Sequence, residues 1–269
     1  MTMGVDVVII GAGPAGMSAA NTINEFGGNV VVLDEQAAPG GQIYKAIDHV
    51  RHDRPNELMW LGPTYSEGAR LTEKFGSQEI DYRPGSMVWN IEGPTSDGFY
   101  TVYYSRTGKS RKLVTGYIIA ATGAMERPVP IPGWTLPGVM TVGAIQSVMK
   151  NSGIYPSGKL ILAGTGPLVL QLANQLIAAN VDIAAILDTS PKGSFVRALK
   201  YFPRAAIAGD YLFKGWKLAR EVQRSGVKIY RNVTDLAALG ENSVQNVSFK
   251  ENGEEHCLEV DTLALHEGI

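Results

Sequence analysis

Cysteine is almost absent from this sequence of 269 residues, which contains a single one, Cys257. One cysteine excludes, within this chain, an internal disulfide, a Cys-x-x-Cys redox pair and a metal site built from several thiolates. Dithiol reductase chemistry, which needs a second cysteine near the redox centre, is excluded with them. Cys257 falls in a predicted late strand beside His256 and Glu259, and we expect its thiol to be a bystander.

The sequence also lacks an excess of charge and any long apolar run. Lys and Arg number 24 against 26 Asp and Glu, and no basic stripe is interleaved with aromatic residues, so we expect no nucleic-acid partner. No apolar run reaches the roughly 20 residues that a bilayer requires. The N-terminus has no signal-peptide pattern. We therefore expect a cytoplasmic protein without a membrane span.

Histidine is scarce as well, with four residues that form no metal-ligand spacing. His49 and His52 fall in a segment that we interpret as a solvated, charged loop, Asp48–Asp53. His266 is expected to be a hydrogen-bonded structural residue. The histidines therefore predict neither a metal site nor an acid–base residue for substrate oxidation, and no catalytic residue is assigned.

Glycine, in contrast, is abundant, with 31 residues, and one group follows a predicted strand, Val5–Ile10. The run Gly11-Ala12-Gly13-Pro14-Ala15-Gly16 leads into a predicted helix, Ala15–Phe26, and a second strand, Val30–Leu33. Its three glycines allow a tight turn, a close approach of the backbone to a pyrophosphate and close packing of helix on strand. The free amides of the helix start favour phosphate.

An acidic pair completes this first motif. Asp34 ends the second strand, where a carboxylate accepts the ribose hydroxyls of a dinucleotide, and the adjacent Glu35 could share or take that role. The strand, the turn, the helix and the acid together predict a Rossmann-type site for the ADP half of a dinucleotide.

The same unit occurs a second time. The strand Lys159–Ala163 meets Gly164-Thr165-Gly166-Pro167, and a predicted helix, Leu168–Ala179, leads to the strand Val181–Leu187. Val169 stands at the third glycine position, where its side chain should push the helix off the strand. The second site is predicted at Gly164, Gly166, Pro167 and Asp188. Asp188 would suit an adenosine ribose, which leaves NADH, ATP or no ligand open.

Each unit is followed by apolar segments broken by turn residues, which predict a small antiparallel meander. The first set is Ser86–Ile91, Phe99–Ser105 and Lys112–Ala120, closing at Ala121-Thr122-Gly123. The second set is Lys228–Asn232, Val244–Lys250 and Cys257–Leu265, closing at His266-Glu267-Gly268. Between the copies, the Pro/Gly-rich stretch from Arg127 to Gly138 indicates a crossover rather than a helix. Two tandem dinucleotide-binding domains are the simplest account.

The first copy resembles the flavoproteins of the glutathione reductase and thioredoxin reductase type. The resemblance implies that Gly41, Gln42 and Ile43 run along the flavin, that Val88 contacts adenine and that Ala121, Thr122 and Gly123 close the site. It makes FAD the expected first cofactor. The implied α/β fold has two Rossmann-like, three-layer domains, each with a small antiparallel meander, and the NAD-type domain inserted in the FAD domain.

A narrower resemblance rests on Ala121-Thr122-Gly123-Ala124-Met125-Glu126-Arg127-Pro128, Gly164-Thr165-Gly166-Pro167-Leu168 and Leu265-His266-Glu267-Gly268. These segments are similar to the FAD-binding subunit of opine (octopine/nopaline) oxidases, of the group that includes hydrogen cyanide synthase and hydroxyproline dehydrogenase. The resemblance implies an amino-acid-oxidase-like catalytic partner that takes hydride from the carbon next to nitrogen. Members of that group continue with a segment that returns to the FAD domain, which leaves open a longer parent, a split or truncated gene, or another subunit that supplies the segment.

The expected organisation follows from this resemblance. Residues 1–126 form an FAD-binding domain, 127–138 a crossover, 139–265 a degenerate NAD(P)-binding-like domain, and 266–269 the start of the return. The chain is expected to be an FAD subunit, or its N-terminal portion, that oxidises a C–N bond together with its partner. Partners are a possible source of membrane association. An NADH-dependent flavin reductase and a non-catalytic nucleotide-binding module are the alternatives.

Overall fold

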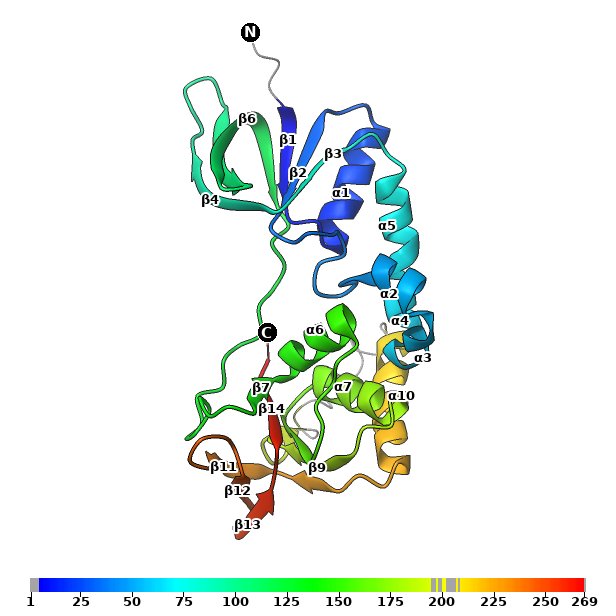
Figure 1. Cartoon of the computed structure of the whole chain (residues 1–269), viewed down its shortest axis with the longest axis vertical. Helices are drawn as coiled ribbons and strands as arrows, with labels where there is room; N and C mark the ends of the chain where they lie inside the picture. Colours follow the sequence, from blue (N-terminus) through cyan, green and yellow to red (C-terminus); the bar gives the residue numbers. More distant parts are fainter. Residues whose placement is uncertain (1–4, 195–196, 198–199, 202–206, 208, 269) are drawn as a thin grey trace. The chain divides into compact units, whose positions relative to one another are not determined.

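The computed structural model describes residues 5–194, 197, 200, 201, 207 and 209–268, and the chain divides into two compact units, residues 1–124 and 125–269. Each unit holds parallel strands with helices on one face of the sheet (Figure 1). Within the part of the chain that the structure describes, no helix is long and apolar enough to cross a membrane.

The first unit is built on a six-stranded mixed sheet. Its elements are β1 (Val5–Ile10), α1 (Pro14–Glu25), β2 (Val30–Asp34), α2 (Ile47–Asp53), a 3-10 turn η1 (Pro55–Glu57), α3 (Leu58–Leu61), α4 (Pro63–Ser66), α5 (Gly68–Gly76), β3 (Asp81–Pro84), β4 (Ser86–Glu92), β5 (Tyr100–Arg106) and β6 (Lys109–Ala120). The strand order is β3-β2-β1-β6-β5-β4, parallel from β3 to β6 and antiparallel from β6 to β4.

Both faces of the first sheet are covered because its central strands are continuous apolar runs. Ile9 and Val32 pack with Met17 of α1 and Phe75 of α5 on the helical face. On the other face, Val8, Val31 and Leu33 pack against Val102 and Tyr104 of β5, so the meander forms a third layer (Figure 1).

The second unit repeats this plan with a separate meander sheet. Its elements are β7 (Val139–Thr141), α6 (Val142–Ser152), β8 (Leu160–Gly164), α7 (Pro167–Ala178), β9 (Ile183–Asp188), α10 (Gly209–Arg224), β10 (Ile229–Arg231), β11 (Val233–Leu239), β12 (Asn246–Glu251), β13 (Glu254–Glu259) and β14 (Thr262–His266). The parallel sheet has the order β10-β9-β8-β14-β7, and β11-β12-β13 form an antiparallel sheet.

The meander of the second unit covers one face of its parallel sheet. Ile161 and Leu187 of the parallel strands pack with Val247 and Phe249 of β12 in one buried cluster. The predicted fold class, two Rossmann-like α/β units that each carry an antiparallel meander, is thereby confirmed.

Three local predictions were wrong. The segment Asp48–Asp53 is not a loop but part of α2, whose Ile47 and Val50 are buried against Leu61 and Tyr65. The predicted strand Lys228–Asn232 does not belong to the meander, because β10 pairs in parallel with β9. The meander instead begins with β11, which the sequence pattern did not reveal.

The third error concerns Cys257–Leu265, predicted as one strand. The segment is two strands, β13 and β14, because the backbone turns at Val260 and Asp261. The amide of Asp261 donates to the Lys159 carbonyl at 2.9 Å, and the Asp261 carboxylate accepts from the Lys159 amide at 2.7 Å. These bonds direct β14 into the parallel sheet beside β8. Cys257 lies in β13 and is exposed.

Candidate functional site

The first candidate site is the glycine turn after β1. Gly11 adopts φ +102°, and a Cβ at this position would lie 2.4 Å from the Ala121 carbonyl oxygen. Only glycine tolerates both the backbone conformation and this approach. The Ala121 amide donates to the Ile10 carbonyl at 2.8 Å, so the end of β6 lies against the turn. Ala121 thus lies at the turn, while Thr122 and Gly123 follow it as exposed residues.

Helix α1 packs directly on this turn through Gly16. A Cβ on Gly16 would lie 1.9 Å from the Gly11 carbonyl oxygen. The helix begins at Pro14, and Gly13 before it has no side chain to cap the first amides. Unfilled amides at a helix start bind anions, since they add hydrogen bonds to the positive end of the helix dipole. The exposed Ala15 leaves this end of α1 open.

The loop after β2 closes over the same turn. The Gly40 amide donates to the Ala12 carbonyl at 2.9 Å. Gly41 adopts φ +59°, and a Cβ on it would lie 2.8 Å from the Gly13 Cα. The backbone of the Gly40–Gly41 loop therefore lies against the backbone of the glycine turn. No side chain at these positions blocks the space that a bound phosphate would need. Gln42 and Ile43 follow as exposed residues, with Ile43 55% accessible.

The two acids at the end of β2 lie in different environments. Asp34 is 6% exposed, and its carboxylate accepts from the Ala12 amide and, at 2.7 Å, from the Gln36 amide. Glu35 is exposed, and its carboxylate accepts from the Gln36 side-chain amide at 3.2 Å. Of the two, only Asp34 lies in contact with the glycine turn.

A tyrosine that the sequence pattern did not reveal lies beside this acid. Tyr82 of β3 is paired with Val32 of β2, and its ring packs edge-on against Phe75 at 5.3 Å. Its hydroxyl is buried and has no hydrogen-bond partner among the residues that the structure describes. Burial raises the pKa of Tyr82 well above its ordinary value, and the nearby Asp34 carboxylate raises it further. The hydroxyl is thus a proton donor that lacks an acceptor.

The predicted adenine contact, Val88, lies elsewhere in the fold. It sits in β4 at a bulge and packs with Val8, Leu33 and Tyr104 in the core beneath the meander. Its side chain is half-buried there. Its role as the adenine contact stays a prediction.

The second glycine turn follows β8 and has the same architecture. A Cβ on Gly164 would lie 1.9 Å from the His266 carbonyl oxygen, as Gly11 approaches Ala121 in the first unit. The Asp188 carboxylate accepts from the Ser190 amide at 2.9 Å, as Asp34 accepts from Gln36. The Thr165 amide differs from its counterpart Ala12, because it donates to the His266 carbonyl at 3.1 Å.

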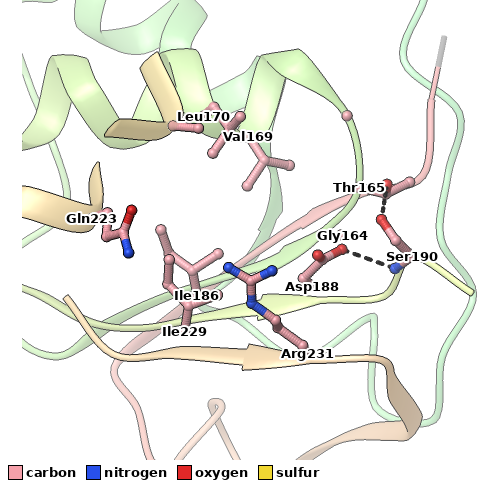
Figure 2. A pocket seen from close by; sticks show the side chains of 12 residues that line it. Gly164, Thr165, Val169, Leu170, Ile186, Asp188, Ser190, Gln223, Ile229 and Arg231 are labelled. Carbon is pink, nitrogen blue, oxygen red and sulfur yellow. Dashed lines mark hydrogen bonds between the residues drawn. The ribbon is translucent and has the colours of Figure 1, made fainter. Parts of the chain in front are cut away.

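Beside this second turn lies a cavity of about 450 Å³. Its apolar lining is formed by Val169 and Leu170 of α7 on one side and by Ile186 of β9 and Ile229 of β10 on the other (Figure 2). Most of its polar groups gather at the strand ends, and these are Asp188, Ser190, Thr165, Arg231 and the backbone of Gly164 and Gly166, whereas Gln223 of α10 lies across the cavity from them (Figure 2). Val169, only 3% exposed, fills the position that Gly16 holds in the first unit. Pro167 begins α7. The arrangement suits a small molecule with an apolar body and polar edge.

His266, whose backbone contacts the second turn, forms a buried hydrogen-bonded pair with Glu126. His266 Nδ1 lies 2.5 Å from Glu126 Oε1, with side-chain exposures of 4% and 12%. Glu126 Oε2 accepts from the Gly143 amide at 2.7 Å, at the start of α6. His266 is thus the hydrogen-bonded structural residue that the sequence predicts, and Glu126 is its unforeseen partner. No group of three or more metal-ligating side chains occurs in the described residues.

Replacing Glu126 by alanine is expected to lower the free energy of unfolding by about 2 to 4 kcal/mol, because it leaves two buried donors, on His266 and Gly143, unpaired. Urea unfolding of the full chain followed by circular dichroism measures the change. Glu241→Ala, at an exposed position, is the matched control and should change the unfolding curve little. Equal effects of the two substitutions would contradict a structural role for the pair.

The chain has clear relatives among known proteins. The family model described as "Pyridine nucleotide-disulphide oxidoreductase" matches residues 5–269. The chain is 37% identical to an opine oxidase subunit of Agrobacterium tumefaciens (strain Ach5) over 267 residues, which cover 98% of this chain and 52% of that protein. It is 35% identical to hydrogen cyanide synthase subunit HcnB of Pseudomonas protegens over 200 residues, 72% of this chain and 40% of that protein.

A solved structure agrees with the fold. The thioredoxin reductase of T. acidophilum superposes with a TM-score of 0.67 at 17% identity, covering 98% of this chain and 76% of that one. At that identity the likeness concerns the fold alone. The chain spans about half the length of the opine oxidase subunits that it matches, 52% and 50%.

Proposed function

The chain belongs to the pyridine nucleotide-disulphide oxidoreductase family, and from this membership we propose that it is the FAD-binding subunit, or the N-terminal portion of that subunit, of a multi-subunit oxidoreductase that oxidises a C–N bond of an opine or amino acid. The observation that carries the proposal is the first glycine turn, in which three backbone segments meet without side chains beside a buried carboxylate.

The residues of the first unit fit FAD. The contacts of Gly11, Gly13 and Gly41 make a cradle that a Cβ would fill, and the open amides of α1 suit a pyrophosphate. Asp34 offers a carboxylate for the ribose hydroxyls, and the orphaned Tyr82 hydroxyl offers a buried donor close to it. When bound, FAD supplies an acceptor for hydride, and the protein's task is to hold and orient it.

The chain's own residues then have three roles in this proposal. The glycine turn and the start of α1 hold the pyrophosphate, Asp34 orients the ribose, and the loop Gly41–Ile43 runs along the flavin. Ala121, Thr122 and Gly123 close the site, as the resemblance implies. Glu35 and Val88 remain candidates for the ribose and adenine contacts. We assign no acid–base residue to this chain, and we place proton removal from the amine on the proposed partner.

The proposed partner is an amino-acid-oxidase-like catalytic subunit, and the complex is a hetero-oligomer. The word "subunit" in the names of the relatives supports this arrangement, and the single cysteine argues against a dithiol mechanism in this chain. We place the complex in the cytoplasm.

The second unit is proposed to bind a nucleotide at Gly164, Gly166, Pro167 and Asp188. The cavity beside Asp188 and its apolar lining support this site, and Asp188 suits an unphosphorylated ribose. NADH there would make the chain a free-standing NADH-dependent flavin reductase, the alternative function. ATP would make the second unit regulatory or structural instead.

An FAD titration with reduction assays tests the proposal. The full chain, stripped of flavin, is expected to bind FAD and develop flavin absorbance bands. The flavin bands are then expected to bleach when the opine and the proposed catalytic partner are added, and to persist with NADH alone. Bleaching by NADH without a partner would instead favour the reductase. A protein that gains no flavin bands would overturn both enzymatic functions.

A further inference from the structure

Helix α10 (Gly209–Arg224) is held to its unit by very little of its surface. Val222 is the single buried residue of this helix, and Gly215 and Leu218 are partly covered. These three positions lie on one side at helical spacing, so the opposite side of α10 faces solvent. A helix of a globular protein normally turns polar residues to solvent.

The solvent side of α10 carries aromatic residues instead. Phe213 and Trp216 are 65% and 53% exposed, and their rings lie 5.8 Å apart. The guanidinium of Arg220 lies over the Trp216 ring, 4.9 Å from its centre. Leu212, 44% exposed, precedes Trp216 by four residues and extends this apolar surface toward the start of the helix, whereas Tyr211, 80% exposed, lies on the side of Gly215 and Leu218. Exposed apolar patches of this kind mark interaction sites.

Cationic residues continue the same side toward the end of the helix. Lys217, Arg220 and Arg224 follow Phe213 and Trp216 at spacings of three and four residues, so all five form one stripe, here called the α10 ridge. Glu221 approaches the stripe only through a loose contact with Lys217 at 3.9 Å. The ridge is therefore apolar in its first half and positively charged in its second.

We propose that the α10 ridge docks the protein on an anionic phospholipid surface, with Phe213 and Trp216 at the acyl boundary and the cations among the phosphates. Helices with Trp, Phe and Leu beside Lys and Arg bind at such interfaces. The positive charge of Lys217, Arg220 and Arg224 is complementary to the negative charge of an anionic lipid layer. A second copy would set two basic ridges against each other, and this repulsion opposes self-association through α10.

Vesicle flotation with the full chain tests the proposal. The vesicles contain phosphatidylcholine with about one-third phosphatidylglycerol, a charge density at which basic segments bind. We expect the chain to float with these vesicles, to bind less as salt is raised, and to ignore pure phosphatidylcholine. The double substitution Phe213→Ser and Trp216→Ser is expected to weaken binding at least about tenfold. Lys217→Gln with Arg220→Gln should cost about fivefold for each charge.

Matched controls come from the first unit. Trp89 is 55% exposed on β4, and Arg111 and Lys112 are exposed on β6, so Trp89→Ser and the pair Arg111→Gln, Lys112→Gln alter equivalent groups away from the ridge. Both controls should leave flotation unchanged. Circular dichroism and FAD titration show that the ridge variants keep the fold and the first site.

Three results would overturn the proposal. These are an absence of flotation, equal flotation with pure phosphatidylcholine, or a loss in the ridge variants no larger than in the controls. If the chain ignores vesicles while the ridge substitutions abolish its complex with the proposed catalytic partner, the ridge is a protein-docking face. None of these results bears on FAD binding, which is tested separately.

Discussion

Substitution of Gly16 by alanine is expected to abolish FAD binding and to destabilise the first unit by about 3 kcal/mol. The added Cβ would lie 1.9 Å from the Gly11 carbonyl oxygen, which is backbone and has no room to move while β1 keeps its place in the sheet. Helix α1 must therefore shift away from the turn, and its first amides move away from the pyrophosphate with it. Titration with FAD and urea unfolding measure the two effects.

Gly76→Ala provides the control for Gly16→Ala. Gly76 ends α5 in the same unit, and a Cβ there would meet no atom within 4 Å. This substitution should leave FAD binding unchanged and alter stability by less than about 1 kcal/mol. If Gly16→Ala behaved like Gly76→Ala, the close packing of α1 on the turn would not be what holds the cofactor.

The second copy of the motif shows why the third glycine matters in the first copy. Val169 stands where Gly16 would be, is buried, and lines the cavity between α7 and the strands. The sequence comparison of the two copies predicted a displaced helix from that one side chain. It could not predict the cavity, because Ile229 and the residues of α10 that complete it are contributed by segments far along the chain.

Local patterns were enough for much of the fold. The runs Val5–Ile10 and Val30–Leu33 and the glycines between them specify strand, turn and strand through short-range sterics, and their bounds were nearly right. The helices α2 to α5 were missed because their amphipathic pattern is short and interrupted by Pro55, Gly62 and Pro63. Their helical state depends on burying Val50, Leu61 and Tyr65 together.

Pairing partners could not be predicted from local patterns. β10 has the composition of a meander strand, but its register with β9 is decided by which edge is free in the folded sheet. The same limit applies to the site. Tyr82 carries no motif, and its position beside Asp34 arises only when β3 pairs with β2. Glu126 likewise meets His266 from the opposite end of the second unit's sequence.

Substitution of Asp34 by asparagine is expected to weaken FAD binding by about 10- to 100-fold, since a hydrogen bond to a charged group contributes about 1.5 to 3 kcal/mol. Asparagine keeps one oxygen for the Gln36 amide, so the turn after β2 should survive. Its NH2 group is a donor and accepts from neither the Ala12 amide nor a ribose hydroxyl. Fluorescence titration with FAD measures the affinity, and urea unfolding reports the cost to the fold.

The neighbouring acid and the second unit supply the controls for Asp34→Asn. Glu35→Gln changes an exposed carboxylate that bonds only to the Gln36 side chain among the described contacts, and FAD affinity should change less than about twofold. Asp188→Asn makes the same chemical change at the second turn and should leave FAD affinity unaltered. If Glu35→Gln weakened binding and Asp34→Asn did not, the ribose would be held by Glu35. Asp34 would then serve only to tie the glycine turn to β2 through the Ala12 amide.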